Sequence, residues 1–213
     1  MKTSDATLDS TDTDLRRTLK HICRDKAYCL EFSGTTTGNA FLFSAPDTLT
    51  TSLHNLSGFL RAYWTEIRAD QNEDIRIPLN LYQGGRLVFG ARGDVATVSV
   101  SPQARDAVMR DALKYNPQWD RVEIRLSRKL GKPLTRASTP VVEGAELHVV
   151  GYIERTGMQS FSGRRIANPF GASAISDMFS PEGLNVVRFA TYYGGARLSG
   201  APVLNAKGKC WVY

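Results

Sequence analysis

Short strand-like runs separated by turns dominate this chain and limit what it can fold into. Residues 29–32 and 40–43 are apolar runs on either side of a polar turn with two glycines, the signature of a strand, a turn and a second strand. Further runs of this kind are found at 48–51, 75–82, 86–89, 94–100, 121–126, 146–153, 185–192, 202–205 and 209–213. They fall into two halves of similar size, and closed barrels are one way to remove the exposed edges of so many short strands. We therefore predict an all-β fold.

Three segments carry a helical pattern instead. Thr13 is a candidate N-cap for a short helix that follows an N-terminal arm. Leu56, Phe59, Leu60, Tyr63, Trp64 and Ile67 form one broad apolar stripe, which predicts a helix that faces the core. Ser101 followed by Pro102 predicts the start of a helix that runs to about residue 115 and connects two β units.

The composition is that of an ordinary globular protein. The chain has 213 residues, of which 42% are hydrophobic and 23% charged. No apolar run reaches the roughly 20 residues of a membrane helix, and residues 1–14 lack the apolar region of a signal peptide. Three cysteines without metal-ligand spacing indicate a reducing compartment, so we expect a cytoplasmic protein with no metal or cofactor. The net charge of +6 is scattered along the chain, which argues against a nucleic-acid partner.

The serine turn at residues 194–204 is the first candidate for chemistry. Ser199 lies between glycines and is followed by Gly-x-Pro and an apolar run that predicts a buried strand. Such a turn can present a hydroxyl outward while backbone N–H groups converge beside it, as a nucleophile and an oxyanion site require. An ordinary tight turn has the same residues, so the interpretation depends on finding a base.

His54 is the histidine best placed to be that base. It lies between a β-branched strand and a helix, where a side chain can be held at the edge of a cleft. His148 lies inside an apolar strand and is more typical of a core or surface histidine, and His21 lies on the N-terminal helix. A general base needs a carboxylate to orient it, and Asp94, at the head of an apolar strand, is the candidate. The alternative interpretation of Asp94 is a residue that stabilises a turn or strand edge.

Four segments resemble, in chain order, signature segments of the chymotrypsin-like serine proteases. They are residues 38–54 ("G-x-x-F … L-T-A-A-H"), 94–96 ("D-[IVL]-A"), 142–152 ("G-x-x-[LV]-x-x-x-G") and 199–208 ("S-G-[GST]-P-[LV]-[VL]-[ND]-x-x-G"). The resemblance implies two six-stranded antiparallel β-barrels, with the active site between them and a connecting helix from Ser101. It also implies that Ser199 attacks a peptide carbonyl, His54 transfers the proton and Asp94 orients His54. In that family the backbone N–H groups of Ser199 and Arg197 would form the oxyanion hole.

Departures from the family pattern concern the substrate side. Arg197 stands where the family usually has glycine, so either the oxyanion loop is longer and completed by Gly194 or Gly195, or the oxyanion hole is not preformed. Tyr193, six residues before Ser199, takes the position that often sets primary specificity, and Thr191 lies beside it. Because no acid stands there, a preference for Lys or Arg is not expected. We count Thr191, Tyr193, Gly194 and Gly195 as substrate-binding candidates.

The predicted organisation has four parts: 1–26, an N-terminal arm and short helix; 27–101, the first barrel; 102–120, a connecting helix and linker; and 121–213, the second barrel. Residues 155–181 are rich in Gly, Ser, Pro and Asn and predict a long loop. Since only 14 residues follow Ser199, the second barrel is expected to lack its last strands, which a downstream segment or second polypeptide would supply.

The predicted function is a serine endopeptidase that acts on a protein or peptide substrate, has no membrane partner and processes a viral polyprotein. The first alternative is a cytosolic regulatory protease from a bacterium. The second is a protease-fold binding module with impaired catalysis.

Overall fold

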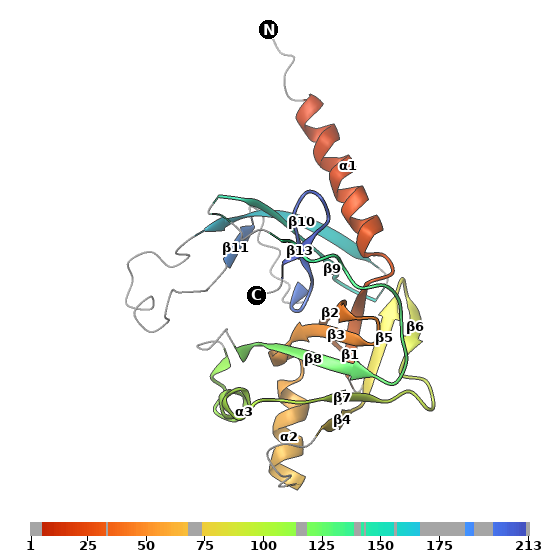
Figure 1. The fold of residues 1–213 in the computed structure, drawn as a ribbon, viewed down its shortest axis with the longest axis vertical. Helices are drawn as coiled ribbons and strands as arrows, with labels where there is room; N and C mark the ends of the chain where they lie inside the picture. Colours follow the sequence, from red (N-terminus) through yellow and green to blue (C-terminus); the bar gives the residue numbers. More distant parts are fainter. Residues whose placement is uncertain are drawn as a thin grey trace.

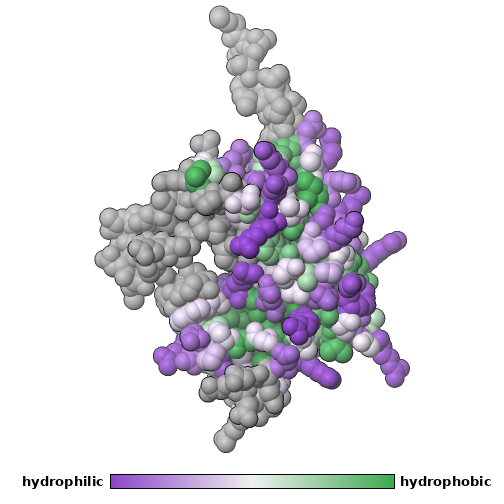
Figure 2. Space-filling view, in the orientation of Figure 1, coloured by the Kyte–Doolittle hydropathy of each residue, from purple (hydrophilic) through white to green (hydrophobic). Residues whose placement is uncertain are grey.

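The computed structural model describes residues 6–32, 34–67, 74–113, 119–138, 142, 144–155, 157–166, 186–189 and 198–211. Within these ranges most of the regular structure is β-strand, arranged in two antiparallel sheets that lie one above the other in Figure 1. The predicted all-β, two-barrel fold class is confirmed. Hydrophilic residues cover much of the described surface, and hydrophobic residues show between them (Figure 2).

The first sheet has eight strands in the order β4-β7-β8-β3-β2-β1-β5-β6. Their bounds are β1 Ala27–Phe32, β2 Thr35–Ala45, β3 Thr48–Ser52, β4 Ile75–Ile77, β5 Leu79–Gln83, β6 Arg86–Phe89, β7 Ala96–Val98 and β8 Arg121–Leu126. Its core holds fully buried leucines such as Leu30, Leu42 and Leu49, and is completed by the apolar stripe of helix α2 (Ser57–Ile67). The helix predicted from that stripe is confirmed.

Pro78 forces the first sheet to curl. The single strand expected at 75–82 is wrong, because Pro78 has no N–H for a sheet ladder and separates β4 from β5. These two strands pair with β7 and β1 respectively, near opposite ends of the strand order, although one residue joins them. The two ends of the sheet must therefore come together, as in a barrel.

The second sheet has five described strands in the order β11-β10-β9-β12-β13. They are β9 Glu146–Tyr152, β10 Met158–Ile166, β11 Val186–Phe189, β12 Val203–Leu204 and β13 Cys210–Trp211. Strand β10 lies in the region expected to be a long loop, so that prediction is wrong for residues 158–166. The pattern misled because serine, glycine and arginine dominate this strand, and its pairing with the apolar β9 keeps it in the sheet.

The first barrel extends further along the chain than the sequence predicted. Strand β8, expected to open the second barrel at residue 121, pairs with β3 and β7 in the first sheet. Helix α3 (Pro102–Met109) begins at Ser101 and Pro102 as predicted, and the Ser101 hydroxyl caps it by accepting from Ala104 N–H. It joins β7 to β8 and packs on α2, so it connects strands within one sheet instead of lying between the barrels. The sheet that the next strand joins is decided by its pairing with strands distant in the sequence, which a local pattern does not show.

Helix α1 (Ala6–Cys23) covers the second sheet. It begins at Ala6, so the helix start expected at Thr13 is wrong, and residues 6–12 belong to the helix instead of the expected arm. Buried Leu19 and Cys23 pack with Phe41 of β2, Val150 of β9 and other residues into a second core. Among the described helices, none is both long and apolar enough to cross a membrane.

Candidate active site

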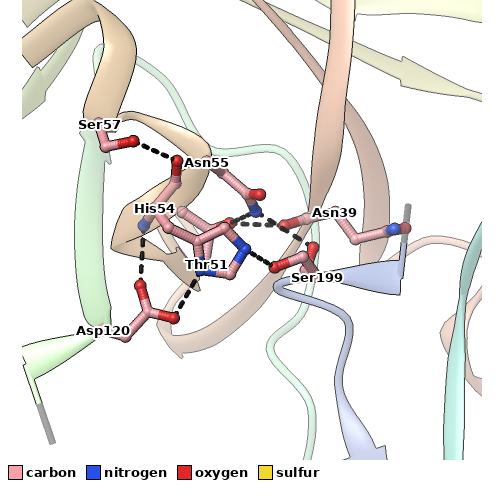
Figure 3. A network of polar contacts seen from close by, with 7 residues as sticks. All are labelled: Asn39, Thr51, His54, Asn55, Ser57, Asp120 and Ser199. Carbon is pink, nitrogen blue, oxygen red and sulfur yellow. Dashed lines mark hydrogen bonds and ion pairs between the residues drawn. The ribbon is translucent and has the colours of Figure 1, made fainter. Parts of the chain in front are cut away.

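Ser199, His54 and Asp120 meet where the two sheets face each other (Figure 3). The Ser199 hydroxyl contacts His54 Nε2, and His54 Nδ1 lies 2.6 Å from a carboxylate oxygen of Asp120. The other carboxylate oxygen accepts from the His54 backbone N–H at 2.8 Å. The side chains of His54 and Asp120 are 47% and 23% exposed, so the imidazole is open to an incoming molecule.

The register of two strands brings Asp120 to His54. Strands β3 and β8 are antiparallel with Ser52 opposite Arg121, so the residue before β8 lies opposite the residue after β3. The backbone confirms this, since Leu53 N–H donates to the Asp120 carbonyl at 3.1 Å. The chain then turns through a short 3₁₀ helix, η1 (Leu53–Asn55), which presents His54 toward the second sheet. The predicted position of His54, between a strand and a helix, is confirmed.

The carboxylate fixes the tautomer of His54. An ionised carboxylate only accepts hydrogen bonds, so His54 Nδ1 must carry the proton that points at Asp120. In a neutral imidazole the other nitrogen, Nε2, is then an acceptor and faces the Ser199 hydroxyl. This arrangement can draw the proton from a serine that attacks a carbonyl carbon.

Gly200 allows Ser199 to approach the first sheet. Its φ of +78° lies in the left-handed region, and a Cβ there would collide with the Asn39 carbonyl oxygen and the Thr51 hydroxyl. The turn closes with Ala201 N–H donating to the Leu198 carbonyl at 2.9 Å. The apolar run predicted to seat the turn is β12, whose Leu204 is fully buried.

A network of three buried polar residues, Asn39 of β2, Thr51 of β3 and Asn55 of η1, holds the Ser199 backbone. The Ser199 carbonyl accepts from Asn39 N–H at 2.7 Å and from the Asn55 side-chain amide at 3.1 Å, so both of its lone pairs are used. Asn55 also donates to the Thr51 hydroxyl, which in turn donates to the Asn39 carbonyl at 2.6 Å (Figure 3). We call Asn39, Thr51 and Asn55 the polar clamp.

The polar clamp also ties the two sheets together. The Asn39 side chain donates to the Tyr152 carbonyl at 3.0 Å and accepts from Tyr152 N–H at 2.6 Å, which joins β2 to β9. These bonds are buried, where a lost partner costs about 1–3 kcal/mol. They fix the separation of the two sheets beside Ser199 and His54.

Asp94 does not contact His54, which corrects the predicted triad. Its carboxylate accepts from Gly90 N–H at 2.9 Å and from Ala91 N–H at 3.3 Å. It also pairs with Nε and Nη2 of Arg128 at 2.8 and 3.2 Å. These hydrogen bonds, led by that from Arg128, lower the pKa of Asp94. Asp94 lies beside the end of β8, since Ala96 pairs with Leu126, whereas the end of β3 lies beside its start, where Ser52 pairs with Arg121. It stabilises a turn, the alternative considered for it from the sequence.

Other predicted site residues lie outside the described ranges. They are Thr191, Tyr193, Gly194, Gly195 and Arg197. The substrate-binding and oxyanion roles expected for them stay predictions, as does an oxyanion role for the Ser199 N–H. His148 is fully buried with Nδ1 3.1 Å from the Ser162 hydroxyl, in agreement with a core histidine.

Neither Asp120 nor the polar clamp was predicted from the sequence. One signal for Asp120 was present, because it heads a run of alternating polar and apolar residues that becomes β8. That signal was set aside when 121–126 was placed in the second barrel. For Asn55 the sequence offers no local signal, because its amide reaches Ser199 across 144 residues of the chain.

An apolar pocket of about 360 Å³ adjoins His54. It is lined by Phe32, Thr37, Asn55, Gly58 and Phe59 as well as His54. The rings of Phe32 and Phe59 are stacked with centroids 6.4 Å apart. A side chain bound beside the imidazole would therefore meet an aromatic surface.

Comparisons with known proteins give matches in structure alone. No protein-family model and no curated protein matches the chain. Deg5 superposes with a TM-score of 0.55 at 13% identity over 93% of this chain and 83% of that one. The MamO protease domain of Magnetospirillum magneticum gives 0.53 at 13% over 89% and 83%, and the active form of the Rv3671c protease of M. tuberculosis gives 0.50 at 17% over 90% and 70%. At these identities the likeness establishes the fold, which is the chymotrypsin-like double barrel.

Proposed function

We propose that the chain is a serine endopeptidase in which Ser199 is the nucleophile, His54 the general base and Asp120 the residue that orients His54. The observation that carries the proposal is the unbroken sequence of contacts from the Ser199 hydroxyl through both imidazole nitrogens to the Asp120 carboxylate. The fold adds support, since the MamO domain and Rv3671c are described as proteases.

In the proposed reaction Ser199 Oγ attacks the carbonyl carbon of a peptide bond while His54 Nε2 takes the serine proton. The Asp120 carboxylate stabilises the imidazolium that forms. His54 then gives the proton to the leaving amine, and the peptide C–N bond breaks to leave an acyl-serine. Water, activated by His54, hydrolyses this ester and restores Ser199.

The polar clamp has a defined part in this mechanism. It holds the carbonyl of Ser199 from two sides, so the hydroxyl on the same residue is kept at His54. Catalytic groups displaced by about 1 Å can lose roughly a hundredfold in rate. Asn39, Thr51 and Asn55 are thus positioning residues for the nucleophile.

More specifically, we propose that the chain is a bacterial regulatory protease. The named structures include proteins from two bacteria, and one further match is the HtrA-type protease AlgW (TM-score 0.53, 15% identity, 91% of this chain and 52% of that one). These matches do not support the expected viral polyprotein protease. They fit the bacterial alternative better.

The substrate class follows from the pocket beside His54. Its aromatic lining favours an apolar side chain next to the scissile bond, because burying such a side chain is worth about 1.5–3 kcal/mol. Phe59→Ala should reduce kcat/KM about tenfold for peptides with Phe or Leu next to the cleaved bond and leave those with Ser there nearly unchanged.

The experiment that tests the function is cleavage of a defined peptide library by the purified chain, with products identified by mass spectrometry. Ser199→Ala is the matched control, since it removes one oxygen. We expect products from the wild type and none from the variant. Equal cleavage by both proteins, or no cleavage and no labelling by a fluorophosphonate, would contradict the proposal.

A further inference from the structure

A second cavity lies between the end of α1, the turn after β5 and the second sheet. Its volume is about 680 Å³, within the roughly 300–1,000 Å³ of small-molecule sites. We call it the α1 cavity. None of its lining residues contacts His54 or Asp120, so the proposed peptidase site does not account for it.

Four basic residues of α1 and the turn after it form one wall of the α1 cavity: Arg17, Lys20, His21 and Arg24. Their spacing of three or four residues places them along one side of the helix, while Leu15, Leu19 and Ile22 face the second core. Arg17 pairs with Asp14, an exposed contact at 3.0 Å. In the described part of the chain, Lys20, His21 and Arg24 form no ion pair, and no acidic residue lines the cavity.

Gln83 and Gly84, at the end of β5 and in the turn after it, line another part of the α1 cavity. The Gln83 side chain lies beside the Tyr28 hydroxyl, which donates to the Asp25 carbonyl. This part of the lining adds no charge to that of the basic wall.

The floor of the α1 cavity is apolar. It is formed by Met158 and by buried Tyr152, whose hydroxyl accepts from Gly84 N–H at 3.3 Å. Burial raises the pKa of Tyr152 while the nearby charge of Arg24 acts in the opposite direction, so Tyr152 presents a neutral ring beside cationic groups. A bare inorganic anion would leave most of this volume and its apolar floor unused.

We propose that the α1 cavity binds an organic acid: a carboxylate that faces Lys20 and Arg24, joined to an apolar body that covers Tyr152 and Met158. The charge of the basic wall selects the anion, and the apolar floor requires the hydrocarbon.

Calorimetric titration of the purified chain with diphenylacetate tests the proposal. Diphenylacetamide has nearly the same shape without the charge, and we expect it to bind at least tenfold more weakly. Inorganic phosphate has the charge without the apolar body and should also bind at least tenfold more weakly. No saturable binding of diphenylacetate, or equal binding of the acid and the amide, would overturn the proposal, and phosphate binding as tight as the acid would overturn its organic part.

Variants assign the binding to this cavity. The double variant Lys20→Gln/Arg24→Gln should weaken diphenylacetate at least tenfold, whereas the control Arg92→Gln/Lys129→Gln removes two exposed positive charges elsewhere and should not. Melting curves verify that each variant is folded. Undiminished binding by Lys20→Gln/Arg24→Gln would refute the site.

Discussion

Asp94 and Asp120 are two acids in similar sequence positions with different partners. Each stands shortly before a strand of the first sheet, β7 and β8 respectively, and each carboxylate accepts from backbone N–H groups. Asp94 faces Arg128, whose pKa is raised chiefly by its hydrogen bond to Asp94, so the pair keeps its charges. Asp120 faces His54, whose other ring nitrogen contacts the Ser199 hydroxyl. The comparison shows that the partner of the carboxylate, more than the acid itself, decides whether the residue stabilises the fold or takes part in catalysis.

Replacing Ser199 or His54 should have the largest effect on activity. Ser199→Ala and His54→Ala should each lower kcat by about 10⁵–10⁶-fold, and the double variant should lose no more than either alone, because the two act as a unit. Steady-state kinetics on one peptide measure this. Additive losses would contradict a shared proton transfer.

Loosening the polar clamp should have an intermediate effect. Asn55→Ala removes one of two donors to the Ser199 carbonyl, so we expect kcat to fall about 10–100-fold while KM changes little.

Ser127→Ala is the matched control near Asp94, since it also removes one hydrogen bond, from Val95 N–H. It should alter the melting temperature slightly and leave kcat unchanged. If both variants lower kcat equally, the clamp has no special role in positioning Ser199.

Replacing Asp94 should affect stability alone. Asp94→Asn weakens the pair with Arg128 and should lower the free energy of unfolding by about 1–2 kcal/mol. The folded state lowers the pKa of Asp94 below its ordinary 3.8, so this stabilisation is present above that pH and is lost as the pH falls through the folded pKa.

Denaturant titrations of wild type and Asp94→Asn should therefore differ by a constant amount at neutral pH and converge as the pH falls from 3.8 through the lowered pKa of Asp94. If the difference in the free energy of unfolding widens on acidification, the direction of the pKa shift of Asp94 is wrong.

The sequence predicted what local pattern determines. His54 was identified from the strand and helix on either side of it, and Ser199 from the glycines and the apolar run that seat its turn. Helices α2 and α3 followed from an apolar stripe and from a cap followed by proline.

The partner of His54 could not be found in the same way. An acid before a strand occurs at both Asp94 and Asp120, and only the pairing of β8 with β3 distinguishes them. That pairing joins segments about 70 residues apart, across α2 and α3, and depends on how the whole sheet closes. The polar clamp is non-local for the same reason, since Asn55 and Ser199 are 144 residues apart.

The rate of Ser199 labelling by a fluorophosphonate in Asp120→Asn and Asp94→Asn, two identical chemical changes, tests the central claim most directly. Because an asparagine that donates to Nδ1 stabilises the wrong tautomer of His54, Asp120→Asn should label about 10⁴-fold more slowly than wild type. Asp94→Asn should label within about twofold of wild type. Slow labelling of Asp94→Asn together with unchanged labelling of Asp120→Asn would contradict the assignment of Asp120 to the active site.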